Sequence, residues 1–158
     1  MLKRYWEIAK EMEEKTIMNG IADFMSKDHD RLDGLFKEFQ SKKITEPENV
    51  KKSFFDFKSG LERHIVWEEE ILFPIFEERT GMQGGPTAVM RMEHIQIKKL
   101  LSSIYDQILK RNFETESLES QLFGILSSHN VKEENVLYPW IDQTLSLEEI
   151  KVTFQKLN

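Results

Sequence analysis

The chain has 158 residues, a formal net charge of −6, four histidines and no cysteine. This length suits a single domain, residues 1–158, and so acidic a chain is not expected to bind nucleic acid or an anionic membrane. Without cysteine, zinc-thiolate sites, iron–sulfur clusters and disulfides are excluded, so a metal must be held by His, Asp, Glu or backbone oxygen. No apolar run reaches the roughly 18 residues of a membrane span, and we expect a cytoplasmic protein with no membrane partner.

Four polar breaks divide the rest of the chain into helical segments. They lie at residues 42–47, 81–86, 111–117 and 145–146. The first two end in Pro47 and Pro86, and proline suits the first turn of a following helix. In the fourth, Ser146 and Glu149 have the spacing of a capping box, which predicts a short C-terminal helix over 146–157.

Between the breaks, buried-type residues recur at alternating spacings of four and three, the period of a helix in a bundle. The four seams are Ile21, Met25, His29, Leu32, Phe36 and Phe39; Val50, Phe54, Phe57, Leu61, His64, Glu68, Ile71 and Ile75; Met90, His94, Ile97, Leu101, Ile104 and Ile108; and Leu122, Leu126, His129, Glu133, Val136 and Trp140. We therefore predict an all-α fold, an antiparallel up-down four-helix bundle over about residues 20–142 with short additional terminal helices.

The N-terminal segment, residues 1–18, is predicted to be an amphipathic helix. Its apolar face is formed by Leu2, Tyr5, Trp6, Ala9 and Met12. We expect this face to cap the bundle or to join two copies of the chain, so that the protein is a monomer or a homodimer.

An internal repeat relates the two halves of the chain. An offset of 65 residues superimposes His29 on His94, His64 on His129, Glu68 on Glu133 and Pro74 on Pro139, without a gap. The bundle is therefore expected to consist of two helical hairpins related by a pseudo-twofold axis.

The four histidines and two glutamates of the seams are predicted to face the core together: His29, His64, Glu68, His94, His129 and Glu133. Burying carboxylates without partners is costly, and no Lys or Arg shares these seams. Imidazole and carboxylate are ready metal ligands, and six of them are too many for one tetrahedral ion. We predict two metals, one held by His29 and His64 and the other by His94 and His129. In this arrangement the two glutamates bridge the metals.

This ligand set favours iron, with manganese or zinc as competitors. Bis-histidine haem is an alternative that explains the histidines but leaves the two glutamates unexplained. Open coordination positions on such ions bind small ligands such as dioxygen, nitric oxide or peroxide.

The two His-x-x-x-Glu motifs, each followed by Leu-Phe-Pro or Leu-Tyr-Pro, together with His29 and His94, resemble the hemerythrin-like or HHE domain family. The resemblance covers about residues 21–142. It implies a four-helix bundle that holds two non-haem iron ions (Fe2+/Fe3+), bridged by oxo or hydroxo when oxidised. Members of this family carry or sense oxygen, sense iron or repair damaged iron centres.

Two positions differ from the oxygen-carrying members of the family. Met90 stands where those proteins have a fifth histidine, and Glu133 stands where they have a bridging aspartate. The set of four histidines and two glutamates is closer to the iron-centre repair and iron-sensing members. We therefore expect a di-iron protein that binds dioxygen, NO or peroxide in sensing, scavenging or handling. Iron-centre repair, or peroxide or NO reduction, is the alternative.

Overall fold

The computed structural model describes residues 2–157; of the first 18 residues it describes the backbone from Leu2 and only the side chains of Arg4, Glu7, Lys10 and Met12. The elements in chain order are α1 (Leu2–Thr45), η1 (Pro47–Asn49), α2 (Val50–Trp67), η2 (Glu68–Leu72), α3 (Phe73–Thr80), α4 (Pro86–Leu109), α5 (Glu116–Lys132), η3 (Glu133–Leu137), α6 (Tyr138–Thr144) and α7 (Leu147–Leu157). Pro47 and Pro86 begin helical elements as predicted, and Ser146 and Glu149 form the predicted capping box.

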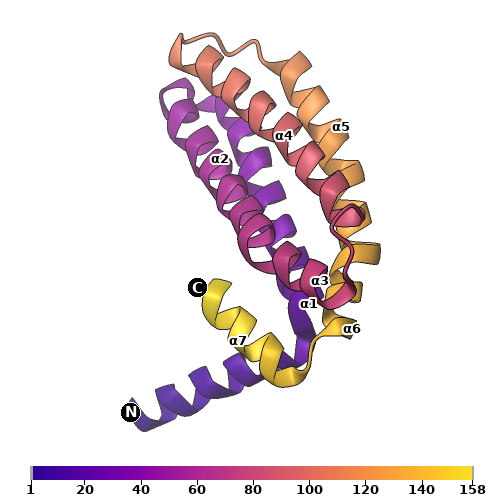
Figure 1. Cartoon of the computed structure of the whole chain (residues 1–158). Coiled ribbons are helices and arrows are strands. Elements are labelled where there is room, and N and C mark those ends of the chain that lie inside the picture. The colour runs from indigo at the N-terminus through magenta and orange to yellow at the C-terminus, as the bar shows by residue number, and fades with distance from the viewer. Residues whose placement is uncertain (1, 158) are drawn as a thin grey trace.

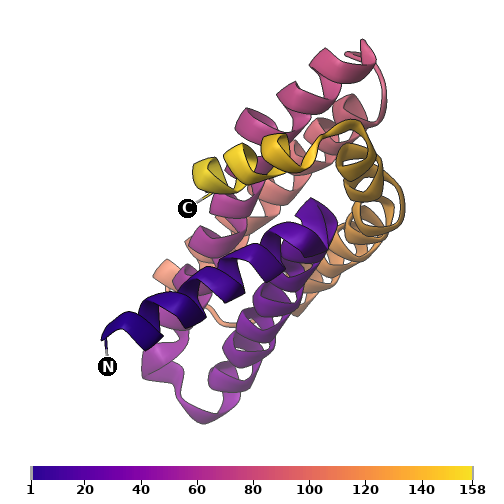
Figure 2. The same cartoon turned by 90° about the horizontal axis from the view of Figure 1, so that it is seen from below.

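Four helical arms run side by side and antiparallel: the second part of α1, the α2–η2–α3 arm, α4, and the α5–η3–α6 arm (Figure 1). This arrangement confirms the predicted all-α bundle with terminal helices. The first part of α1 leaves one end of the bundle, and α7 lies at the same end (Figure 2). There α7 packs on α1, where the rings of Phe24 and Phe154 meet edge to face with centroids 5.3 Å apart. The side chains of Leu2, Tyr5, Trp6 and Ala9, on which the predicted capping or dimer contact depends, lie outside the described residues.

Each motif helix contains one turn of π-helix that begins at the motif glutamate. The η2 turn starts at Glu68 and the η3 turn at Glu133, and each closes with a hydrogen bond from the backbone N–H five residues later. The residues that donate these closing hydrogen bonds, Phe73 and Tyr138, are followed by Pro74 and Pro139. Proline has no N–H, and its ring crowds the preceding turn of a regular helix. A widened turn accommodates the proline, and such π turns are frequent at functional sites.

The π turns shift the buried face by one residue beyond each glutamate. The sequence predicted that the seams continue through Ile71 and Ile75 and through Val136 and Trp140, and this was wrong. The residues buried there are Leu72, Phe73, Phe76, Leu137, Tyr138 and Ile141. Val136 is 55% exposed. Because residues i and i+5 lie above one another in a π turn, Phe73 and Tyr138 share the face of the motif glutamates.

The hydrophobic core is divided into two clusters by the polar residues of the seams. One cluster gathers around Phe39, Phe54 and Ile104, and the other around Met25, Phe73 and Tyr138. In every arm the histidine lies in the chain between a member of one cluster and a member of the other. The predicted site is therefore a polar layer closed at both ends by apolar side chains.

The change of direction in α1 occurs at Gly20, whose φ of 81° lies in the left-handed region. Asp142, from the end of the opposite arm, accepts hydrogen bonds from the backbone N–H groups of Ile21 (2.7 Å) and Ala22 (2.9 Å). A Cβ on Gly20 would lie 2.8 Å from the Asp142 carboxylate. Asp142 thus caps the bundle part of α1 and fixes its position against α6.

Replacing Asp142 with Ala is expected to destabilise the protein by about 2–3 kcal/mol, because two backbone donors lose a charged acceptor. Urea unfolding measures the change. The control is Asp23→Ala, which removes a surface ion pair with Lys27 and is expected to cost less than about 0.5 kcal/mol. Equal effects of the two substitutions would contradict the assignment of Asp142 as the cap.

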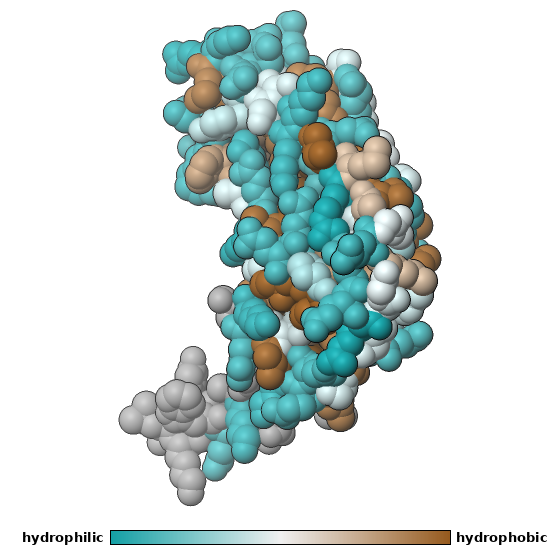
Figure 3. Space-filling model, in the orientation of Figure 1, coloured by the Kyte–Doolittle hydropathy of each residue, from teal (hydrophilic) through white to brown (hydrophobic). Residues whose placement is uncertain are grey.

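The surface is mostly hydrophilic with scattered apolar side chains, as the face in Figure 3 shows. Among the described residues, none of the helices combines the length and apolar character needed to cross a membrane.

Candidate metal centre

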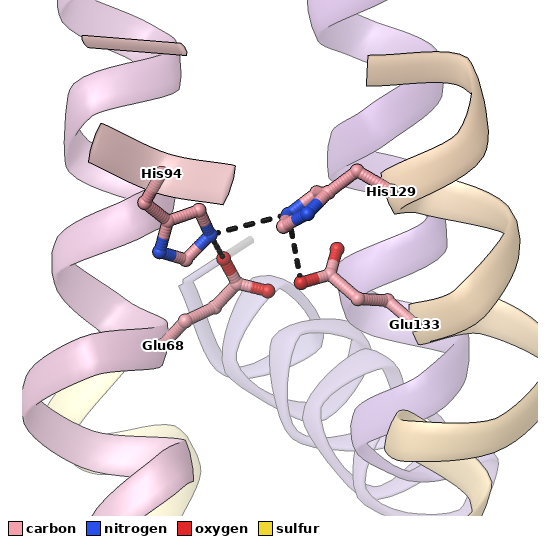
Figure 4. Close-up of side chains that lie close together, drawn as sticks. All are labelled: Glu68, His94, His129 and Glu133. Atoms are coloured by element: carbon pink, nitrogen blue, oxygen red, sulfur yellow. Dashed lines mark hydrogen bonds and ion pairs between the residues drawn. The ribbon is translucent and has the colours of Figure 1, made fainter. Parts of the chain in front are cut away.

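The structure brings all six predicted residues together in the middle of the bundle. His29 comes from α1, His64 from α2 and His94 from α4, and all three are at most 4% exposed. His129 lies in the last turn of α5, and the two glutamates begin the π turns with no exposed surface. Figure 4 shows four of these side chains converging, with Glu68 and His94 on one side and His129 and Glu133 on the other.

Each carboxylate has one oxygen near each pair of histidines. For Glu68, Oε1 lies 3.6 Å from His64 Nε2 and Oε2 lies 3.2 Å from His94 Nε2. For Glu133, Oε1 lies 3.0 Å from His129 Nε2 and Oε2 lies 3.4 Å from His29 Nε2. Both glutamates therefore span the two histidine pairs, which is the placement that bridging ligands require.

The ligand atoms fall into two groups, each with atoms within 4.8 Å of one another. One contains His94, His129 and both glutamates, and the other contains His29, His64 and Glu133. These groups separate the histidines into the same two pairs that the sequence predicted.

Every histidine turns its Nε2 inward, because its Nδ1 makes a hydrogen bond with a carboxylate on a neighbouring arm. The pairs are His64 with Asp28 (2.9 Å), His129 with Glu93 (2.7 Å), His94 with Glu69 (2.9 Å) and His29 with Glu134 (2.7 Å). When Nδ1–H donates to a carboxylate, the lone pair of Nε2 is left to face a metal, and the ring orientation is fixed. The arrangement obeys the repeat, since the offset of 65 residues exchanges the first pair with the second and the third with the fourth.

Two of these carboxylates, Glu69 and Glu134, were missed by sequence reasoning. Each follows a motif glutamate in an acidic run, and they hold His94 and His29. The signal that identifies them is the repeat itself, which superimposes Glu69 on Glu134. Asp28 and Glu93 each precede a ligand histidine in the chain, and each holds the Nδ1 of a histidine on the neighbouring arm.

Three of the four carboxylates that hold a histidine also accept a hydrogen bond from a lysine or arginine on their outer side. The fourth has no such partner among the described residues. Asp28 accepts from Arg31 (2.7 Å), Glu69 accepts from Lys98 (3.0 Å) and Glu93 accepts from Lys132. Glu134 has no such ion pair in the described part of the chain, and Asp33 occupies the repeat position of Lys98. The His29 side of the centre is therefore electrostatically different from the other three.

The buried carboxylates strongly favour protonated imidazole in the protein without metal. Burial by itself lowers the pKa of His64, but Glu68 and Asp28 outweigh it and raise that pKa to about 10. Burial likewise lowers the pKa of His129, and Glu133 raises it to about 9. For Glu68, burial raises the pKa, but His64 and His94 hold it well below its ordinary value. Metal binding must therefore displace protons from imidazole.

The metal-free protein is expected to lose stability as the pH rises through about 9 and 10, the raised pKa values of His129 and His64. A raised pKa in the folded state means that folding takes up a proton at any pH between the unfolded and folded pKa values. The ion pairs therefore contribute their full stability below pH 6.5, the pKa of an unfolded histidine, and lose it as the pH rises toward the folded pKa values. Metal affinity is expected to rise over the same interval, since fewer protons compete for Nε2.

Urea unfolding of the chelator-treated protein at a series of pH values measures this stability. The reference is Glu68→Gln, which removes the carboxylate that raises the pKa of His64 and should flatten the profile. A wild-type profile no steeper than that of the variant would contradict the assignment.

Two carboxylate oxygens, Glu68 Oε2 and Glu133 Oε1, are fully buried and have no hydrogen-bond partner among the described residues; the groups facing them are the Nε2 atoms of His94 and His129, at ion-pair distance. A buried carboxylate oxygen without a hydrogen bond costs free energy, and a divalent cation beside both would remove that cost. His94 Nε2 and His129 Nε2 face each other at 3.1 Å beside these oxygens. The residues present therefore fit a bound cation, and the cluster is a buried His/Glu group able to hold a metal.

The Tyr138 hydroxyl is directed into the other part of the centre. It donates to Glu68 Oε1 and lies 3.0 Å from Glu133 Oε2. Burial raises the pKa of Tyr138 well above its ordinary value and the two glutamates raise it further, so the hydroxyl keeps its proton in the protein without metal.

The fold and the centre together define a cation-binding helical bundle. Residues 11–141 match the family model described as "Hemerythrin HHE cation binding domain". The match covers most of the chain, and this protein belongs to the hemerythrin HHE family.

Two relatives show how far the similarity extends. The chain is 30% identical over 136 residues to a protein named "DNA nickase" from Nostoc sp. (strain PCC 7120). The aligned segment covers 86% of this chain and 37% of the relative. It is 28% identical over 133 residues to an uncharacterized hemerythrin-like protein of Schizosaccharomyces pombe. This aligned segment covers 84% of this chain and 64% of the relative. The chain thus spans less than two thirds of the length of either relative. No solved structure matches the chain significantly.

Proposed function

We propose that the protein is a non-haem di-iron protein that binds dioxygen, nitric oxide or peroxide in a sensing, scavenging or handling role. The observation that carries the proposal is the placement of the two buried glutamates, each with one oxygen toward each histidine pair. A bridging geometry of this kind is suited to two ions close together, and imidazole with carboxylate is a ligand set that suits iron.

In this proposal, His29 and His64 hold one iron and His94 and His129 hold the other, with Glu68 and Glu133 shared. The irons supply reversible electron transfer and coordination positions for the small ligand. The protein holds the imidazoles in one tautomer through carboxylates such as Asp28 and Glu93, and it excludes bulk water with the two apolar clusters.

A cavity of about 220 Å³ between α1 and α5 supports a small ligand. It is lined by His29, Asp30, Asp33, Phe36, Phe57, Phe123, Leu126, Ser127, Asn130, Val131 and Glu134. Sites for drug-sized molecules enclose roughly 300–1,000 Å³, so this cavity is better suited to a diatomic molecule, peroxide or water than to a larger metabolite. It reaches the centre at His29, on the side where Glu134 has no outer cation.

The test is a visible spectrum of iron-loaded, reduced protein exposed to dioxygen, with separate samples exposed to NO and to peroxide. A new band that disappears when the gas is removed supports ligand binding. Immediate conversion to a stable oxidised form supports the alternative, iron-centre repair or peroxide or NO reduction. Spectra that do not respond to any of the three reagents would contradict the proposal.

Replacing Asp33 with Lys is expected to slow the reaction of the reduced centre with dioxygen several-fold without changing its iron content. The new lysine gives Glu134 the ion pair that Lys98 gives Glu69, and its long side chain stands at the cavity. Stopped-flow absorbance measures the rate, and Asp33→Asn, which removes charge without adding bulk, is the control. An unchanged rate in the lysine variant would show that the ligand enters elsewhere.

We propose no nucleic-acid partner for this chain. The net charge of −6 opposes phosphate binding. The relative named "DNA nickase" is matched over only 37% of its own length, so its name does not assign that activity to the matched part. Incubation of the iron-loaded protein with supercoiled plasmid tests this, and nicking above that of a Glu133→Gln control would contradict it. The cytoplasmic location and the monomeric or dimeric state stay predictions.

A further inference from the structure

The two metal positions proposed above differ in one buried side chain, at the repeat pair Phe73 and Tyr138. At one position the ring of Phe73 stacks on His94, with centroids 5.8 Å apart and planes 6° from parallel. At the other, Tyr138 presents a hydroxyl in the middle of the ligand atoms. Both side chains are fully buried, and both reach the centre because the π turns bring the fifth residue after each glutamate onto its face.

The Tyr138 hydroxyl contacts four atoms, one from each ligand residue that faces this position. It lies 3.2 Å from His64 Nε2, 3.3 Å from His29 Nε2 and 3.0 Å from Glu133 Oε2, and it donates to Glu68 Oε1. The other oxygens of the two glutamates, Glu68 Oε2 and Glu133 Oε1, are those without a hydrogen-bond partner. The hydroxyl therefore serves one metal position and has no counterpart at the other.

The three distances of 3.0, 3.2 and 3.3 Å are close to those between neighbouring ligands of one ion. In an octahedral complex with bonds of about 2.1 Å, adjacent ligand atoms are about 3.0 Å apart, and each vertex has four such neighbours. The contacts of the hydroxyl with His29, His64 and Glu133 are those expected of a further protein ligand at this position.

We propose that Tyr138 coordinates the metal held by His29 and His64, so that the two metals of the centre are chemically inequivalent. This inference rests on the di-iron proposal. On coordination the phenolic O–H bond is broken, an oxygen–iron bond forms, and the proton leaves to the buffer. The iron at this position then has an anionic oxygen ligand, which favours its ferric state, while the iron beside Phe73 has no such ligand.

The experiment uses the full chain loaded anaerobically with Fe2+ and then oxidised in air, with iron content measured on the same samples. Ferric phenolate has a charge-transfer band in the visible range, and Raman excitation within that band enhances the vibrations of the phenolate ring. We expect this band in the wild type, its loss in Tyr138→Phe with iron content retained, and its persistence in Tyr105→Phe. Tyr105 is a matched control because it packs in the distant core cluster.

Each outcome has a distinct meaning. Two irons per chain without a phenolate band, or a band that survives Tyr138→Phe, would overturn the Tyr138 assignment and leave the di-iron proposal standing. Failure of the chain to retain iron would overturn both. Loss of the band in Tyr138→Phe alone, with two irons still bound, supports both.

Discussion

Replacing Glu133 with Gln is expected to abolish high-affinity metal binding at both positions. Glu133 belongs to both groups of candidate ligand atoms, and one of its oxygens faces each histidine pair. Loss of a residue that only supports a ligand typically lowers metal affinity about 10–100-fold, so loss of a shared ligand is expected to exceed that range. Competition against a chromophoric chelator measures the affinity.

Two substitutions in the π turns provide controls for Glu133→Gln. Glu134→Gln removes the carboxylate that holds His29 Nδ1, and it is expected to weaken binding by about 10–100-fold. Glu70→Gln changes an exposed residue of the other π turn and should leave affinity unchanged. If Glu133→Gln bound metal as tightly as Glu70→Gln, the bridging role would be wrong.

Removing the metal is expected to lower the melting temperature by about 10 °C. A ligand present at about 1,000 times its Kd stabilises the folded state by about 4 kcal/mol. For a chain of this size, each kcal/mol shifts the melting temperature by about 2–4 °C. The metal also relieves the cost of the two buried carboxylate oxygens that have no hydrogen-bond partner.

Calorimetry of the protein before and after chelation, and after the metal is restored, measures this shift. The Glu133→Gln variant provides the reference, since its melting temperature should be insensitive to chelator. A wild-type protein that melted at the same temperature with and without metal would contradict a role of the metal in holding the bundle together.

The bundle and its six central polar residues could be predicted because the two halves of the sequence carry the same helical pattern and the same polar positions. The apolar spacing defines the helices, and the repeat shows that residues such as His64 and His129 occupy equivalent positions. Burial then restricts what these groups can be, because a core with this many polar side chains must pair them or bind an ion.

The rest of the centre was not predicted because the helical period was extended unchanged through Pro74 and Pro139. A π turn adds one residue to the turn, and this exchanged Ile71 for Leu72 and Val136 for Leu137 on the buried face. The same shift brought Tyr138 to the centre, which the regular helical period did not predict.

The carboxylates that orient the histidines depend on contacts between arms, which the period of one helix does not predict. Glu69 reaches His94 from the neighbouring arm, and Glu134 reaches His29 in the same way. Only the repeat, applied to every residue of the acidic runs, would have singled out these two acids.

The metal content of the protein as purified is the most direct test of the central claim. Elemental analysis should find two irons per chain and little of any other metal. Iron well below two per chain, with zinc or manganese filling the site, would contradict the di-iron account.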